Sequence, residues 1–154
     1  MMDAQGVSER WGRPGSVRPC ADAGLINRTY LVGDPPWGVL QWVNPIFTPQ
    51  VNHTIALVTE RLASQGLSTP MLEPTLDGEL WVTDTEGCWR MLRFVPGRTV
   101  HAFTDTEQAA SAASLVGRFH RALVGFQHDF LAQRQHAHDT NNHMRNLALA
   151  MDKA

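Results

Sequence analysis

Two runs of apolar and β-branched residues flank a turn near the start of the chain. Residues 25–32 (LINRTYLV) and 37–43 (WGVLQWV) lie on either side of Gly33-Asp34-Pro35-Pro36. Such runs around a Gly/Pro turn are typical of an antiparallel hairpin. We therefore predict two paired strands here, with Gly24 in the turn before the first, where backbone freedom is useful.

The apolar spacing then changes from that of a strand to that of a helix. Residues three or four apart are apolar between positions 51 and 62, namely Val51, Ile55, Val58 and Leu62. Thr48-Pro49 is suited to begin this helix and Gly66 to end it. We expect its apolar face to pack on the sheet.

A second hairpin and further helices complete the pattern. Residues 80–83 and 88–94 flank a turn at 84–87 that ends in glycine. From about Asp105 a wide apolar stripe predicts a helix, with Thr104 or Asp105 as its N-cap. A last helix is expected from Asn142 to the end. This order predicts an α+β fold, an antiparallel sheet with one helix laid on it and a helical part after it.

Composition and charge narrow the class of protein. A chain of 154 residues that is 43% hydrophobic has room for one ordinary domain. Its net charge of −2 argues against a general nucleic-acid binder. It has no apolar run of about 18 residues and no signal peptide, so we expect a cytoplasmic protein without a membrane partner. Cys20 and Cys88 lie in no metal-ligand pattern and are expected to be reduced thiols.

Several segments together resemble the aminoglycoside- and choline-kinase-like phosphotransferases. Residues 24–32 (GLINRTYLV) are similar to that superfamily's nucleotide-loop segment, and 39–44 (VLQWVN) to the strand that follows it. Residues 89–97 (WRMLRFVPG) resemble its hinge, and 117–123 (GRFHRAL) its first large-lobe helix. The G-x-I-N-x-T-Y pattern is most similar to the N-acetylhexosamine kinase branch.

The resemblance implies a protein-kinase-like small lobe followed by the first helices of a large lobe. On this basis we expect a flexible lead-in over residues 1–16, an N-lobe and hinge over 17–97, and the start of a truncated helical C-lobe over 98–154. The superfamily's H-x-D-x-x-x-x-N catalytic loop and its later metal-binding Asp are absent from the sequence. The resemblance therefore implies the N-terminal portion of an ATP-dependent sugar phosphotransferase, inactive as this chain alone.

The resemblance also assigns residues to a nucleotide. Its cradle and hinge imply that ATP is contacted by Gly24, Ile26, Asn27, Arg28, Thr29, Gln41, Arg93, Phe94 and Val95. Ile26, Val39 and Met91 would supply apolar walls, although each is equally well explained as core. Mg²⁺ ligands are expected in the missing C-terminal part. On spacing alone, residues 24–29 are also consistent with an ordinary hairpin turn.

Gln41 occupies the place where protein kinases carry a phosphate-binding lysine. An amide offers hydrogen bonds but no charge, so compensation would come from Arg28, Mg²⁺ or the missing half. Glu60 on the helix would be that lysine's partner. Because the lysine is absent, we interpret Glu60 as a solvated carboxylate.

The polar segment 127–141 is rich in histidine and permits three interpretations. The resemblance of His138-Asp139-Thr140 to a short F-H-D-T segment implies that His138 and Asp139 contact a sugar acceptor. A Zn²⁺ site formed with His136 and His143 is a second interpretation, and a solvated loop is a third.

A non-catalytic role stays open beside the enzymatic one. The chain would then be a remnant or a nucleotide-binding or interaction module. The apolar stripe over residues 112–123 would need a partner, and a homodimer formed through it is the natural expectation.

Overall fold

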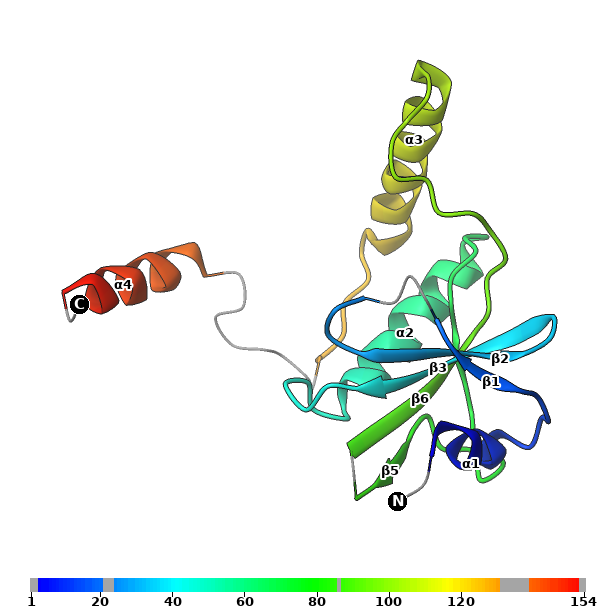
Figure 1. Cartoon of the computed structure of the whole chain (residues 1–154). Coiled ribbons are helices and arrows are strands. Elements are labelled where there is room, and N and C mark those ends of the chain that lie inside the picture. Colours follow the sequence, from blue (N-terminus) through cyan, green and yellow to red (C-terminus); the bar gives the residue numbers. More distant parts are fainter. Residues whose placement is uncertain (1–2, 21–23, 86, 131–138, 153–154) are drawn as a thin grey trace.

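The computed structural model describes residues 3–20, 24–85, 87–130 and 139–152. Over these residues the chain forms one six-stranded antiparallel sheet with helices, the α+β arrangement of a kinase-like small lobe (Figure 1). The strands are β1 (Val17–Pro19), β2 (Arg28–Gly33), β3 (Pro36–Val43), β4 (Leu72–Glu73), β5 (Val82–Asp84) and β6 (Gly87–Arg93). Their order is β1-β2-β3-β6-β4, and β5 also pairs with β6.

The first predicted hairpin is confirmed, with one strand shorter than expected. β2 and β3 pair antiparallel, and the turn closes where Gly33 lies opposite Pro36. Gly33 has a φ of 91°, a conformation that favours glycine. β2 begins at Arg28 rather than at position 25. Leu25 and Ile26 lie before it, in an exposed loop.

The predicted central helix is also confirmed. α2 (Val51–Ser64) follows Thr48-Pro49, and the Val51 amide donates to the Thr48 carbonyl at 3.0 Å. The chain leaves the helix at Gly66, whose φ is 73°. Its buried side chains are Asn52, Thr59 and Leu62. Asn52 faces Cys88 and Arg90 of β6, so the first turn of α2 lies over one face of the sheet.

The main hydrophobic core lies on the opposite face. Side chains alternate between the two faces along a strand, which brings Val32, Leu40, Trp89 and Met91 together here. Leu40 and Met91 are completely buried. The short N-terminal helix α1 (Ala4–Ser8) covers this core, so the sheet is a middle layer between α1 and α2 (Figure 1).

The lead-in predicted to be flexible is instead part of this core. After α1 the chain forms a short 3-10 helix, η1 (Glu9–Trp11). Val7 is completely buried and Trp11 is 5% exposed. The Trp11 indole Nε1 donates to the Glu73 carbonyl at 2.7 Å. The Gly- and Pro-rich composition suggested mobility, but two large apolar side chains have enough buried surface to fix the segment.

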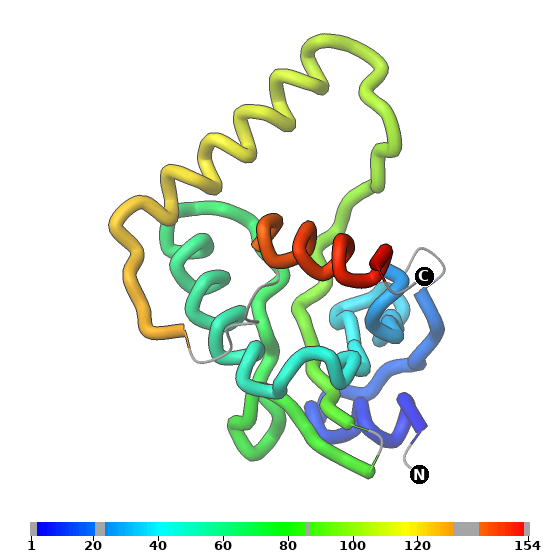
Figure 2. The backbone as a smooth tube through the Cα atoms, turned by 90° about the vertical axis from the view of Figure 1, so that its left-hand side faces the viewer, coloured from blue at the N-terminus to red at the C-terminus, as the bar shows by residue number. Residues whose placement is uncertain are grey.

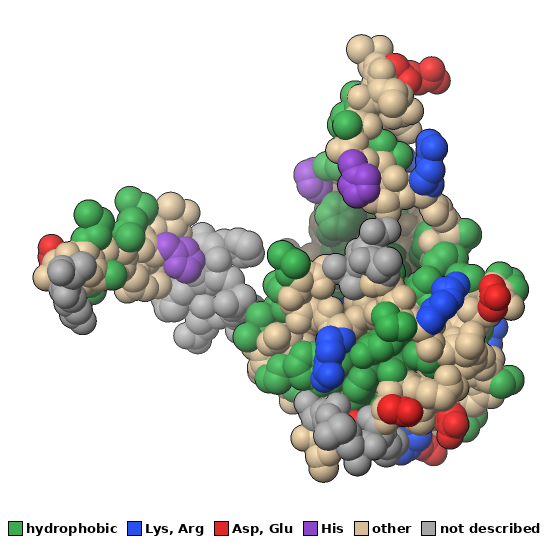
Figure 3. Space-filling model, in the orientation of Figure 1, with side chains coloured by type: hydrophobic (Ala, Val, Ile, Leu, Met, Phe, Trp, Pro, Cys, Tyr) green, Lys and Arg blue, Asp and Glu red, His purple; other side chains and the backbone are tan. Residues whose placement is uncertain are grey.

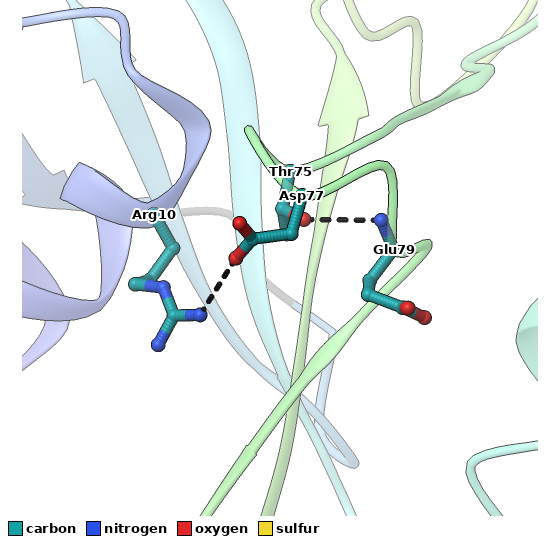
Figure 4. A network of polar contacts seen from close by, with 4 residues as sticks. All are labelled: Arg10, Thr75, Asp77 and Glu79. Atoms are coloured by element: carbon teal, nitrogen blue, oxygen red, sulfur yellow. Dashed lines mark hydrogen bonds and ion pairs between the residues drawn. The ribbon is translucent and has the colours of Figure 1, made fainter.

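A turn between β4 and β5 completes the anchoring of the N-terminal segment. Arg10 Nη2 lies 3.1 Å from Asp77 Oδ2, and the Leu76 amide donates to the Arg10 carbonyl at 3.0 Å. Within the turn, the Glu79 amide donates to Thr75 Oγ1 at 3.1 Å (Figure 4). The first residues of the chain are therefore held by a segment more than sixty positions away in sequence.

The second hairpin is confirmed, and one strand was not foreseen. β5 and β6 pair across the predicted turn. β4 was missed because it is only two residues long and follows Pro70, so it has no alternating pattern to detect. Cys20 and Cys88 are both free thiols, as expected.

The two C-terminal helices form as predicted but bury little surface. α3 (Thr106–Leu123) is capped by Asp105, whose side chain accepts from the Gln108 amide. α4 (Thr140–Met151) is capped by Asp139. The end of α3 approaches α2, where Leu62, Leu67 and Ala122 form a small cluster (Figures 1 and 2). Exposed hydrophobic side chains otherwise mark both α3 and α4 (Figure 3).

Candidate functional site

The loop before β2 is open, and its base is fixed by two asparagines. Asn27 Oδ1 accepts from the Asn44 amide at 3.0 Å, and Asn44 Nδ2 donates to the Ile26 carbonyl at 3.3 Å. Gly24 and Ile26 are exposed, and a Cβ placed on Gly24 would meet no atom within 4 Å. The chain itself therefore does not require glycine at position 24, whereas Asn27 is needed to hold the loop against β3.

A row of three polar side chains crosses the sheet on the face that α2 covers. Thr29 of β2 lies opposite Gln41 of β3, and Gln41 lies opposite Arg90 of β6. Gln41 Nε2 donates to Thr29 Oγ1 at 3.2 Å. Arg90 donates from both Nε and Nη2 to Gln41 Oε1, at 3.0 and 2.8 Å. Two predicted site residues are therefore brought together with one that the sequence did not single out.

The row continues into the first turn of α2. Arg90 Nη1 donates to Asn52 Oδ1 at 3.2 Å, and Asn52 Nδ2 lies 3.6 Å from Cys88 Sγ. Burial raises the pKa of the Cys88 thiol, so the thiol is neutral at physiological pH. Burial also lowers the pKa of Arg90 below its ordinary value. Arginine ionises so far above neutral pH that its guanidinium stays charged in proteins.

The polar contact between the sheet and α2 does not involve Glu60. Glu60 is exposed on α2, as expected for a solvated carboxylate. Asn52, nearer the start of the same helix, makes the polar contact with the sheet, and its partner is an arginine on β6. A polar residue at position 41, inside an otherwise apolar strand, gave a signal that a polar partner lies beside it. The strand register needed to identify Arg90 is not available from sequence.

Arg28 lies apart from this row. It precedes Thr29 by one residue, so its side chain projects from the other face of the sheet. There its guanidinium lies 4.2 Å from the centre of the Trp42 ring and 5.9 Å from that of Trp89. A cation stacked on an indole is a stabilising packing contact. Arg28 therefore does not lie beside Gln41, which removes one of the three sources of charge compensation considered for it.

The predicted hinge has one backbone donor left for a ligand. The Arg93 amide donates to the Met71 carbonyl at 2.7 Å, and the Phe94 amide donates to the Trp37 carbonyl at 3.0 Å. Among the described residues, no carbonyl accepts from the Val95 amide. The Arg93 side chain pairs with Glu73 at 2.7 Å and so points along the sheet edge.

The three predicted apolar walls do not form one surface. Val39 is half-buried on the same face as Gln41, which suits a wall beside the polar row. Met91 is completely buried in the core of the opposite face. Ile26 is 51% exposed in the loop. For Met91 the interpretation as core is the correct one.

Of the two predicted acceptor-binding residues, Asp139 is among the described residues and His138 is not. Asp139 Oδ1 accepts from the Asn142 amide at 2.9 Å, so this carboxylate caps α4. His138 and His136 lie outside the described residues. Within the described part of the chain, no group of three or more His, Cys, Asp or Glu side chains is placed to hold a metal ion.

Two hollows lie near the hinge and α3. One, of about 340 Å³, is lined by Ala63, Leu67, Ser68, Thr69, Met71, Arg93, Phe94, Val95 and Pro96. The other, of about 750 Å³, lies between the segment after the hinge and α3, and Arg98, Phe103 and Arg118 contribute to it.

Of the helices described, none is long and apolar enough to cross a membrane.

Comparison with known proteins identifies the fold. No protein-family model matches the sequence, and no curated protein matches it. A solved structure of an aminoglycoside phosphotransferase from Alicyclobacillus acidocaldarius is similar over 84% of this chain, with a TM-score of 0.58 and 13% sequence identity. The chain spans 39% of the length of that structure. The similarity supports the kinase-like fold predicted from the sequence.

Proposed function

We propose that this chain is the N-terminal, nucleotide-binding portion of an ATP-dependent small-molecule phosphotransferase. The observation that carries the proposal is the likeness in fold to a solved aminoglycoside phosphotransferase, which covers 84% of this chain. The sequence segments that resemble the same superfamily fall on the loop before β2, on β3 and at the hinge, in the matching order.

The residues present suit a nucleotide in two places. The Val95 amide is a backbone donor at the end of β6, where the edge of an adenine ring would lie. Thr29 and Gln41 offer side-chain donors on the neighbouring strands, where phosphate oxygens would lie. A bound nucleoside triphosphate supplies the phosphoryl group that is transferred. Mg²⁺ and the groups that activate the acceptor would be held by parts of the protein outside these residues.

The acceptor in this proposal is a sugar of the N-acetylhexosamine type. The G-x-I-N-x-T-Y pattern at residues 24–30 and the His138-Asp139 pair support that choice by resemblance. Asn27 already holds the loop through Asn44, which is a structural reason for the asparagine in this pattern.

Calorimetric titration of the chain with ATP tests the proposal. We expect saturable binding at one site and no measurable phosphoryl transfer from this chain alone. Val95→Pro removes the hinge amide and should weaken ATP binding, whereas Val95→Ala keeps the amide and serves as its control. Absence of ATP binding to the folded chain would refute the proposal, and turnover by the chain would refute its inactivity.

A second function is favoured by the exposed surface of α3. Leu115 and Val116 are each 54% exposed and Phe119 is 40% exposed, on a helix whose buried residue is Ala122. A non-catalytic module that pairs with a second copy of itself through this face would cover those side chains. Light scattering distinguishes the two functions, because this alternative predicts a dimer that Phe119→Asp converts to a monomer. A monomeric wild-type chain would exclude it.

A further inference from the structure

Arg90 is a half-buried cation without a carboxylate partner among the described residues. Its three hydrogen bonds go to the neutral amides of Gln41 and Asn52. The titratable side chain that acts on it electrostatically is the thiol of Cys88, which burial keeps protonated. Removing a charge from water is unfavourable unless an opposite charge approaches it. Within the described part of the chain, this positive charge on the α2 face of the sheet is therefore not compensated by a negative one.

The neighbouring polar groups use their acceptors inside the protein. Gln41 Oε1 accepts two bonds from Arg90, and Asn52 Oδ1 accepts a third. Thr29 Oγ1 accepts from Gln41. A guanidinium has five N–H donors and a primary amide has two, so both Arg90 and Gln41 have donors left over. The Thr29 hydroxyl hydrogen is also available. What the row offers to a ligand is thus a set of donors around one positive charge.

We propose that the donor row of Thr29, Gln41 and Arg90 binds the phosphate oxygens of a polyphosphate anion, with Arg90 supplying the positive charge. This inference deepens the proposed function and rests on it for the identity of the anion as the phosphate chain of a nucleotide. It places the positive charge on β6, the strand next to β3, which carries Gln41. A lysine at position 41 is then unnecessary, and Arg28, on the opposite face, has no part in binding.

The test compares three probes, ATP, adenosine and inorganic tripolyphosphate, on the whole chain by calorimetric titration. Arg90→Met removes the charge and should weaken ATP and tripolyphosphate binding by about tenfold to a hundredfold, the range typical of hydrogen bonds to charged groups. Adenosine binding should stay within about twofold, as it does not reach the row. Arg28→Met is the matched control and should change none of the three affinities.

Two further variants keep the test decisive if Arg90→Met disturbs the fold. Arg90→Lys retains the charge but loses the forked contact with Gln41, so it should recover part of the tripolyphosphate affinity. Thr29→Val keeps a β-branched side chain and removes one donor, and should weaken both phosphate probes several-fold. Circular dichroism of each variant confirms that the sheet is intact.

The outcomes separate this inference from the proposed function. If ATP binds equally well to the wild-type chain and to Arg90→Met, the donor row is wrong and the proposed function stands. A second outcome is that tripolyphosphate binding depends on Arg90, while adenosine does not bind and ATP binds no more tightly than tripolyphosphate. The row is then a polyphosphate site, and the nucleotide proposal fails. Equal losses in Arg28→Met and Arg90→Met would indicate general charge attraction and overturn the inference.

Discussion

The sheet and the C-terminal helices differ in what covers their apolar residues. In the sheet, Leu40 and Met91 are completely buried and Trp89 is 2% exposed. α3 is longer than any strand, yet Ala122 is its one buried residue, and none of the described residues of α4 is buried. Both regions carry strong apolar patterns in the sequence. The difference shows that such a pattern identifies the face of an element that can be buried, but not whether this chain supplies the cover.

The cover of the sheet comes from an unexpected source. α1 and η1 lie against the core through Val7 and Trp11, and α2 lies on the other face. Because both faces are packed within this chain, the stability of the protein should reside in residues 3–97. The helices that follow should contribute little to it, since their apolar side chains remain largely in contact with solvent in the folded state.

The largest effect is expected from truncating the core tryptophan. Trp89→Ala should lower the free energy of unfolding by about 3–5 kcal/mol, through lost burial and the cavity left behind. Phe119→Ala on α3 should change the free energy of unfolding by no more than about 0.5 kcal/mol, as is usual for surface substitutions. Urea unfolding followed by circular dichroism measures both. Equal losses would show that α3 belongs to the same cooperative unit as the sheet.

A smaller effect is expected where the N-terminal segment joins the core. Trp11→Phe keeps an aromatic ring but removes the Nε1 donor that binds the Glu73 carbonyl at 2.7 Å. The unfolding free energy should fall by about 1–3 kcal/mol because a partly buried carbonyl loses its donor. The same urea experiment applies, with Glu9→Ala, at an exposed position of the same segment, as the control. An unchanged midpoint would mean that the hydrogen bond from Trp11 to the Glu73 carbonyl adds nothing to stability.

The ion pair beside that contact should matter least among the stability changes. Arg10 and Asp77 lie 3.1 Å apart, with side chains 48% and 69% exposed. A double-mutant cycle of Arg10→Ala and Asp77→Ala should give a coupling of about 0–1 kcal/mol that decreases with added salt. A coupling well above this range, insensitive to salt, would show that the pair is not screened by solvent.

The cap of α3 should respond to pH locally. The backbone hydrogen bond from Gln108, with one from Thr104, lowers the pKa of Asp105 below its ordinary value of 3.8. Because the folded-state pKa is the lower one, the stabilisation is present above pH 3.8 and is lost as the pH falls through the folded pKa. The Gln108 amide shift in NMR spectra should follow this titration.

Asp105→Asn provides the control for that titration. Asparagine also caps helices but does not ionise in this range. The Gln108 amide should then keep its shift on acidification, apart from any global unfolding. A titration that persists in Asp105→Asn would assign the change to another group.

The sequence predicted most of the fold because most elements are locally encoded. The hairpin at Gly33, the helix before Gly66 and the cap at Asp105 each depend on a few neighbouring residues, and all three are confirmed. Features that depend on distant pairing were missed. β4 forms through its register with β6, and Trp11 is fixed by Glu73.

The candidate site shows the same division. Thr29 and Gln41 were identified from local motifs, and the structure places them side by side. Arg90 was missed and Arg28 was placed with the wrong partners. Which face an arginine occupies depends on the strand register, and a shift by one residue moves a side chain to the other face.

The most direct test of the account follows the arginine side chains by NMR while ATP is added. Each Nε–H gives its own signal, so Arg90 and Arg28 report on the two faces of the sheet within one sample. We predict a saturable shift of the Arg90 Nε–H, together with those of the Gln41 side-chain amide and the Val95 backbone amide, while the Arg28 signal stays in place. A shift of Arg28 alone, or no saturable shift of Arg90, would contradict the account.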